Sequence, residues 1–355
     1  MNSGRPHGST RRAGAMSTPD PAAPRDDARI TLDVEQATAL GVHALGHVGY
    51  GAAEAEIIAA GLVDAELSGY PALGLARLLS IVEDPRAGEP RAPVAIVHET
   101  PVSALLDGGN NVGLYALDRA SEIAVAKARA TGFALVGVHN SFFSGRNARY
   151  VETISRAGFV CIHTACSEPY VAAPGGTAPE LGTNPIAIGL PGKPDPLILD
   201  MGTSAIARSE VVLAARLGQA LPEGLALDRE GRPTSDAAAA LLGSILPFGG
   251  HKGFGLSLIV QALGLLAGAA LPRGRVQDFG FLFIVFDPAL LMPREEFARQ
   301  LSRLIARIKA TPRQLGVAEI RIPSERAFRE RERRRHDGMT IERAVYDRLV
   351  ALGRA

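Results

Sequence analysis

Four short blocks decide how this chain folds and binds: GGTAPELGTNP (175–185), LILDMGTS (197–204), LPEGLALDREGRPTSD (221–236) and LPFGGHKGFG (246–255). Each block places glycines and small hydroxyl residues beside an apolar run that is typical of a strand or a helix. Glycine lets backbone N–H groups approach an anion closely, so this pattern is typical of a phosphate-binding site.

The fourth block does not match a familiar nucleotide-binding fingerprint. The glycines of GGHKGFG (249–255) lack the spacing of G-x-G-x-x-G, and Lys252 is not followed by serine or threonine as in a P-loop. The sequence therefore predicts a nucleotide site of a non-Rossmann kind.

Apolar periodicity predicts strands that alternate with helices, which indicates an α/β protein. Glycines and asparagines at 107–111 predict a turn. Helices are expected at 33–50, 51–67, 73–82, 114–130, 150–157, 205–217, 256–267, 294–310 and 340–352. Strands are expected at 93–98, 134–138, 159–164, 186–190, 197–200 and 279–286.

The composition indicates a soluble globular chain. Its 355 residues are 46% apolar and 21% charged, which suits a sizeable core. A net charge of +1 without a basic stripe argues against nucleic-acid binding. Two cysteines, Cys161 and Cys166, do not make a disulfide framework, so we expect a reduced, cytoplasmic compartment.

Several segments allow two interpretations. Residues 1–28 are expected to be a disordered leader, and Met16 is an alternative start. The uncharged run Gly253–Leu271 is interpreted as a buried core helix rather than a membrane span. The run Arg326–Arg335 is interpreted as a solvated helix face. The pair His43 and His47 has metal-like spacing but no third ligand in view, so no metal site is expected.

Taken together and in order, the four blocks resemble those of the type-2 malate/L-lactate dehydrogenase family. The resemblance extends to DGGNNVG (107–113) and IPSERA (322–327), where Ser324 replaces the family's glycine, and it covers about residues 30 to 355. It implies an oxidoreductase that uses NADH or NADPH, acts on a small molecule and forms a homodimer, with no nucleic-acid or membrane partner.

The resemblance also implies an architecture and a set of cofactor contacts. A non-Rossmann NAD(P)-binding domain (111–290) is expected beside a domain assembled from the N-terminal (29–110) and C-terminal (291–355) helical segments. The residues expected at the cofactor are Ser167, Gly182, Thr183, Asn184, Met201, Gly202, Thr203, His251, Lys252 and Gly253.

The chain departs from the family at the positions of its usual catalytic histidines. Those positions hold Leu73 and Phe143 here. Tyr70 and His139 are the candidate replacements for the proton donor. Arg77 stands where the family has an arginine expected to hold the substrate carboxylate. The remaining candidate substrate-binding residues are Asn140, Phe142 and Phe143.

Three functions follow from these departures. One is a reductase for a substrate that needs no proton from the enzyme, such as a cyclic imine beside a carboxylate. Another is a 2-hydroxy acid dehydrogenase whose proton-donating acid lies at a different position. Ketone reduction would call for such a group, because a positioned acid raises the reaction rate by about 100- to 10,000-fold. The third is a non-catalytic homologue that binds a nucleotide. The apolar residues Leu73, Phe142 and Phe143 favour a substrate bulkier and less polar than lactate or malate.

Overall fold

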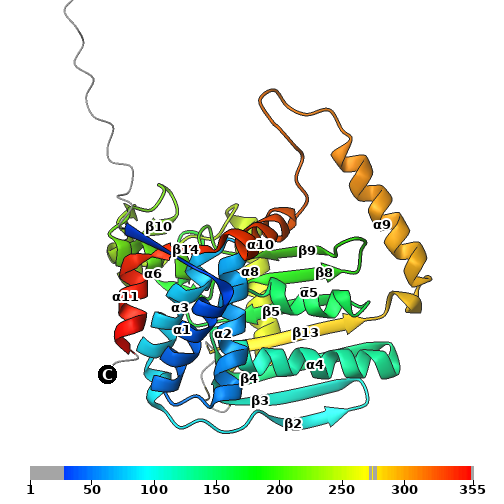
Figure 1. Ribbon diagram of the computed structural model, residues 1–355, viewed down its shortest axis with the longest axis horizontal. Helices are drawn as coiled ribbons and strands as arrows, with labels where there is room; N and C mark the ends of the chain where they lie inside the picture. Colours follow the sequence, from blue (N-terminus) through cyan, green and yellow to red (C-terminus); the bar gives the residue numbers. More distant parts are fainter. Residues whose placement is uncertain (1–27, 272–273, 275–277, 353–355) are drawn as a thin grey trace, which may run out of the picture.

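A mixed seven-stranded sheet forms the largest part of the protein. The computed structural model describes residues 28–271, 274 and 278–352. The strand order is β2-β3-β4-β13-β5-β8-β9, and among these neighbours only β3 and β4 run parallel (Figure 1). The predicted α/β class is confirmed, and the order differs from that of an all-parallel doubly wound sheet. The strands are β2 (Ala95–Thr100), β3 (Ser103–Val112), β4 (Phe133–Phe142), β5 (Val160–Cys166), β8 (Ile186–Leu190), β9 (Leu197–Met201) and β13 (Gly280–Phe286).

Three helices pack against this sheet. Helix α4 (Gly113–Thr131) ends at Gly132, whose φ of 84° is the left-handed conformation that glycine adopts without strain. Helix α5 (Ala148–Arg156) packs on α4 and on β8, and α8 (His251–Leu266) packs on β5 and β13. A fourth helix, α9 (Arg294–Lys309), follows η4 (Pro288–Leu290) and projects away from the rest of the molecule (Figure 1).

Segments from the two ends of the described chain form one helical layer. Strand β1 (Arg29–Leu32) pairs antiparallel with β14 (Met339–Glu342), and α1 packs beside α11 (Figure 1). Asp33 caps α1 as predicted, because its Oδ1 accepts the backbone N–H of Gln36 at 2.7 Å. The helices of this layer are α1 (Val34–His47), α2 (Ala52–Leu67), α3 (Leu75–Glu83), α10 (Glu325–Asp337) and α11 (Arg343–Leu352), with the short turns η2 (Pro71–Leu73) and η3 (Pro85–Gly88).

A second, smaller sheet carries the third glycine-rich block. Its strand order is β11-β10-β12-β6-β7, and its own core contains Val171, Val211 and Ile245. Its elements are β6 (Val171–Ala172), β7 (Pro179–Leu181), β10 (Ala226–Leu227), β11 (Pro233–Thr234) and β12 (Ser244–Ile245), together with α6 (Arg208–Leu217) and α7 (Ala237–Leu242).

The expected turn at 107–111 and the expected start of the last helix are wrong. The expected turn at 107–111 lies inside β3, where the pairing register with β4 shifts between Asp107 and Asn111. A strand irregularity with left-handed residues, such as Gly109 with φ 61°, uses the same residue types as a turn. The helix predicted from residue 340 begins at Arg343, because residues 339–342 form β14.

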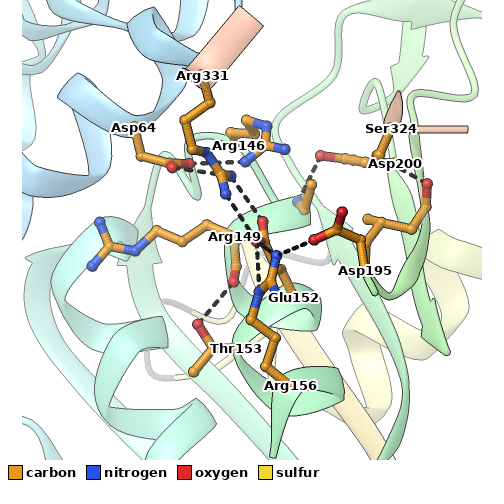
Figure 2. A network of polar contacts seen from close by, with 12 residues as sticks. Asp64, Arg146, Arg149, Glu152, Thr153, Arg156, Asp195, Asp200, Ser324 and Arg331 are labelled. Carbon is orange, nitrogen blue, oxygen red and sulfur yellow. Dashed lines mark hydrogen bonds and ion pairs between the residues drawn. The ribbon is translucent and has the colours of Figure 1, made fainter. Parts of the chain in front are cut away.

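Helix α10 is held by buried ion pairs and does not lie wholly in solvent. Arg331 donates from its two Nη atoms to the two carboxylate oxygens of Glu152, each at 2.8 Å, and lies 3.1 Å from Asp64 Oδ1 (Figure 2). Asp64 also accepts from Arg146 Nη1 at 2.8 Å. The expected solvated face is therefore wrong at Arg331, because its partners come from α2 and α5, which are distant in sequence.

The uncharged run predicted as a buried core helix forms α8, which starts five residues earlier than expected at His251. Ser257 and Val260 on one side are buried, but Leu258, Ile259 and Leu266 are 51%, 58% and 68% exposed. The buried interpretation is wrong for that side. In the described part of the chain, no helix combines the length and the apolar content that a membrane crossing requires. The predicted leader lies outside the described residues except for Ala28.

Candidate active site

A cavity of about 630 Å³ opens where the helical layer meets the loops that follow β4 and β9. It brings together predicted residues that are far apart in sequence. Those that line it are Tyr70, Leu73, Arg77, Phe143, Ser167, Thr183, Met201 and Gly202.

One wall of the cavity comes from the interrupted helix at residues 67–75. Gly69 has φ 80°, Pro71 starts η2, and the backbone turns again at Gly74 before α3 begins. The carboxylate of Glu66 lies under this turn, where its Oε1 accepts the N–H of Leu75 at 3.0 Å. Burial raises the pKa of Glu66 to about 7. The interruption places Tyr70 and Leu73 at the cavity and directs Arg77 toward it from the first turn of α3.

Arg77 carries a positive charge that no described carboxylate neutralises. Its guanidinium carbon lies 3.9 Å from the centre of the Phe143 ring, and its Nε is buried without a hydrogen-bond partner among the described residues. Burial lowers the pKa of Arg77 to about 10. A guanidinium in this state has N–H donors available for a bound carboxylate.

The segment at the end of β4 divides between the cavity and the core. Phe143, with φ 56°, lines the cavity and supports Arg77. Phe142 is buried outside the lining, and Asn140 donates to Asp107 at 2.7 Å. His139 is buried against Gly268, and burial lowers its pKa. The structure therefore brings Phe143 to the cavity but leaves the other three outside its lining.

Two residues of the expected apolar wall, Leu73 and Phe143, line the cavity, and Phe142 lies outside the lining. The ring of Phe143 is covered by Arg77, and the cavity lining includes three further arginines. The expected preference for a bulkier, less polar substrate stays a prediction, because apolar side chains and arginines line the cavity together.

The glycine-rich blocks meet through their backbones behind the cavity. The N–H of Thr203 donates to the carbonyl of Thr183 at 2.9 Å, and the N–H of Phe248 donates to the carbonyl of Thr203 at 3.1 Å. Three of the four blocks are thereby joined at Thr203, which is buried. That these blocks meet in space could be predicted only from the family resemblance, because no local sequence pattern pairs them.

A buried amide fixes the loop that carries Thr183. Asn184 Nδ2 donates to Gln261 Oε1 at 2.9 Å and to Ser257 on α8. A Cβ at Gly182 would lie 2.3 Å from Asn184 Oδ1 and 2.4 Å from Ser167 Oγ, so a larger residue would displace both. Asn184 and Gly182 thus shape the loop behind the cavity lining.

The first turn of α8 holds the remaining predicted cofactor residues. His251 and Lys252 are exposed and Gly253 is buried, and these three lie outside the cavity lining. Gly249 and Gly250 precede them with φ 55° and 62°, and a Cβ at either would meet nothing within 4 Å. The left-handed conformation, and not a lack of space, requires glycine at these positions. The N–H groups of Lys252, Gly253 and Phe254 donate to carbonyls of the same turn.

The sequence prediction missed several polar and charged residues of the cavity, among them Asp200, Arg208 and Tyr170. Asp200 accepts the N–H of Ala148 at 2.7 Å, and burial raises its pKa. The Arg208 guanidinium lies 4.7 Å from the centre of the Tyr170 ring. Asp200 and Arg208 lie close to Met201–Ser204 in the sequence. Their charges beside that block were the feature from which they could have been predicted as site residues. Within the described ranges, no cluster of three or more His, Cys, Asp or Glu side chains could hold a metal ion.

Comparison with known proteins identifies the chain's relatives. The family described as malate/L-lactate dehydrogenase matches residues 32–350. This chain belongs to the malate/L-lactate dehydrogenase family. It is 36% identical over 310 residues to L-sulfolactate dehydrogenase of Methanothermobacter thermautotrophicus, covering 84% of this chain and 89% of that protein. It is 34% identical to Delta(1)-pyrroline-2-carboxylate reductase of Ancylobacter novellus, covering 92% and 98% respectively.

Solved structures of the malate/L-lactate dehydrogenase family share the fold. Malate dehydrogenase from Pyrococcus horikoshii OT3 superposes with a TM-score of 0.81 at 30% identity, covering 93% of this chain and 96% of that one. The protein is therefore an NAD(P)-dependent oxidoreductase acting on CH–OH or CH–NH groups, as the motifs predicted. The roles of Leu73 and Phe143 in place of the family's histidines stay a prediction.

Proposed function

We propose that this protein uses NADH or NADPH to reduce a C=O or C=N group next to a carboxylate. The observation that carries the proposal is Arg77, a partly buried arginine without a described carboxylate partner at a cavity lined by Met201 and Gly202. A buried charge is normally paired, so the missing partner is expected in the ligand.

The residues present fit a nicotinamide cofactor. Gly202 and Thr183 leave room for a flat ring at the cavity, and Ser167 adds a hydroxyl. The glycine turn before α8 starts a helix whose N-terminus carries partial positive charge, and Lys252 adds a full one, which together suit a phosphate. When bound, the reduced cofactor supplies a hydride.

The protein's own residues would orient the substrate and supply the proton. Arg77 would hold the carboxylate through two parallel N–H donors, which fixes the neighbouring carbon in the cavity. We propose Tyr70 rather than His139 as the proton donor, because Tyr70 lines the cavity. The guanidinium carbons of Arg326 and Arg146 lie 4.9 and 5.6 Å from its ring centre, so the ring is held between two arginines.

Tyr70→Phe tests this assignment and separates the two reductase hypotheses. With a 2-oxo acid, kcat should fall by about 100- to 10,000-fold, the range for a lost general acid. With a cyclic imine carboxylate, which arrives protonated, the loss should be much smaller. NAD(P)H oxidation is followed by absorbance, with Tyr115→Phe on α4 as the matched control outside the cavity lining. Unchanged turnover of both substrates by Tyr70→Phe would exclude Tyr70 as the donor.

We also propose that the seven-stranded sheet with α8 is the non-Rossmann cofactor domain, which moves its start from the expected residue 111 to β2. The layer from residues 29–92 and 322–352, in place of the expected 29–110 and 291–355, would form the other domain. The cytoplasm is the proposed compartment, in keeping with two buried, free cysteines. The exposed side of α8, with Leu258, Ile259 and Leu266, supports the proposed homodimer, since such apolar patches commonly mark interfaces. Light scattering that finds only monomers at micromolar concentration would refute the dimer.

A further inference from the structure

The first turn of α3, which carries Arg77, has no cap of its own. Its N-cap residue is Gly74, which has no side chain to accept an N–H group of the turn. The first N–H groups of a helix have no partner within the helix, and a serine or aspartate at the N-cap usually accepts one of them. The direction of Arg77 therefore depends on groups that reach this turn from elsewhere in the chain.

Glu66 supplies the missing cap from α2, across the interruption. Its side chain is buried, and its Oε1 accepts the N–H of Leu75 at 3.0 Å, nine residues further along the chain. A Cβ at Gly74 would lie 2.4 Å from the same oxygen, so glycine leaves the room that this carboxyl needs. The last turn of α2 and the first turn of α3 are thereby joined through one side chain.

Arg216 holds the same turn from α6. Its Nη1 donates to the carbonyl of Ala76 at 3.1 Å, and its Nη2 pairs with Glu83 at the other end of α3. The side chain of Arg216 is only 15% exposed, so these contacts are largely shielded from solvent. Arg216 therefore ties both ends of α3 to α6.

Both residues hold the turn and do not face the ligand. Neither Glu66 nor Arg216 lines the cavity, whereas Arg77 does. The backbone atoms that they hold belong to the two residues directly before Arg77. The parallel N–H donors of an arginine must meet a carboxylate in its plane, and a displacement of about 1 Å can cost ~100-fold in rate. These two contacts are therefore placed to set the position of the Arg77 guanidinium.

We propose that Glu66 and Arg216 are positioning residues for Arg77, which hold the first turn of α3 so that the guanidinium meets the substrate carboxylate. This rests on the proposed function, in which Arg77 binds that carboxylate. The two side chains carry opposite charges and reach the turn from different helices. Loss of position should therefore have the same effect in variants of either residue, whereas an effect of their charges through space would have opposite signs.

The test is the ratio of kcat/KM for 2-oxobutyrate to kcat/KM for its methyl ester. It is measured at about pH 8, above the pKa of about 7 of Glu66, so that both side chains are charged. Glu66→Leu and Arg216→Leu should each lower this ratio by about 10- to 100-fold, the value of one charge-assisted hydrogen bond. The ratio does not depend on the amount of folded enzyme, so a loss of stability alone leaves it unchanged.

Two further variants serve as controls. Glu66→Gln keeps an oxygen that can accept the N–H of Leu75, so it should retain most of the wild-type ratio. Arg348→Leu removes the other partner of Glu83 and should leave the ratio unchanged.

Three results would overturn the inference. If the wild type prefers the acid and both Glu66→Leu and Arg216→Leu keep that preference, the two residues do not position Arg77, although the proposed function stands. A ratio that rises in Glu66→Leu and falls in Arg216→Leu would assign the effect to charge. A wild type without a preference for the acid would refute the proposed function and this inference with it.

If neither compound is reduced, calorimetry with 2-hydroxybutyrate and its methyl ester tests the positioning separately from the reaction. The wild type should bind the acid more tightly than the ester, and Glu66→Leu and Arg216→Leu should both lose that difference. A difference that both variants retain would overturn the inference.

Discussion

Replacing Arg77 by leucine should raise stability and lower activity at the same time. Burial lowers the pKa of Arg77 from 12.5 to about 10, and each pKa unit corresponds to ~1.4 kcal/mol. Below pH 10 the folded protein must hold a charge that the unfolded chain holds more easily, so the charge costs on the order of 3 kcal/mol. Stacking on Phe143 offsets about 1 to 2 kcal/mol. The cost of the buried charge is therefore the larger effect.

The expected result for Arg77→Leu is a gain in unfolding free energy of about 1 to 2 kcal/mol near neutral pH, from these opposing contributions. Urea unfolding followed by circular dichroism measures it. In the same variant kcat/KM should fall by about 100- to 10,000-fold, because two charge-assisted hydrogen bonds to the substrate carboxylate are lost. Arg303→Leu on α9 is the exposed control and should change neither quantity appreciably.

Two results would refute this reasoning. If Arg77→Leu unfolds more easily than the wild type, its guanidinium has a structural partner and is not waiting for a ligand. If the variant is stabilised but retains its kcat/KM, the unpaired charge is real but does not bind the substrate carboxylate.

Two further predictions concern buried charges in the helical layer. Arg331→Met leaves Glu152 and Asp64 without their shared partner and should lower the unfolding free energy by about 3 to 5 kcal/mol; Arg335→Met on the same helix, whose partner Glu332 is exposed, should change it by less than about 0.5 kcal/mol. Urea unfolding of both variants checks this, and equal effects would mean that the Arg331 network contributes nothing specific. Glu66 has its pKa raised by burial from 4.5 to about 7, so the folded carboxyl stays neutral while the unfolded one ionises. The wild type should therefore lose on the order of 3 kcal/mol relative to Glu66→Gln as the pH rises from about 4.5 to about 8. Unfolding curves at the two pH values measure the difference, and parallel pH dependence in both proteins would contradict the assignment.

Local chemistry made many elements predictable from the sequence. Asp33 caps the start of α1, and Gly132 ends α4 in a left-handed conformation. Both effects involve only residues next to each other in the sequence. The same local reasoning failed at Asp107–Asn111, because a strand irregularity and a turn use the same small residues. It also failed on α8, because an apolar sequence shows that a side chain can be buried but does not show what would cover it.

The cavity was predictable only where a motif carried it. Tyr70, Arg77 and Phe143 were found by their places in recognisable segments, and the structure places all three at the cavity. His139 is adjacent in sequence to residues of the site, but its side chain is buried against Gly268. Arg208 was missed because its charge alone does not show that α6 faces the cavity. The prediction of a solvated helix face was wrong at Arg331, because its carboxylate partners, Glu152 and Asp64, are distant from it in sequence.

The central claim is that Arg77 holds a carboxylate beside a carbonyl or imine that receives hydride from NADH or NADPH. The most direct test is oxidation of NADH and NADPH by the wild-type protein, followed by absorbance, with a set of 2-oxo acids and cyclic imine carboxylates and with the methyl ester of each. The account predicts oxidation with the free acids and a kcat/KM lower by about 100-fold or more with the esters. Equal rates with acids and esters, or no oxidation with any member of the set, would contradict it.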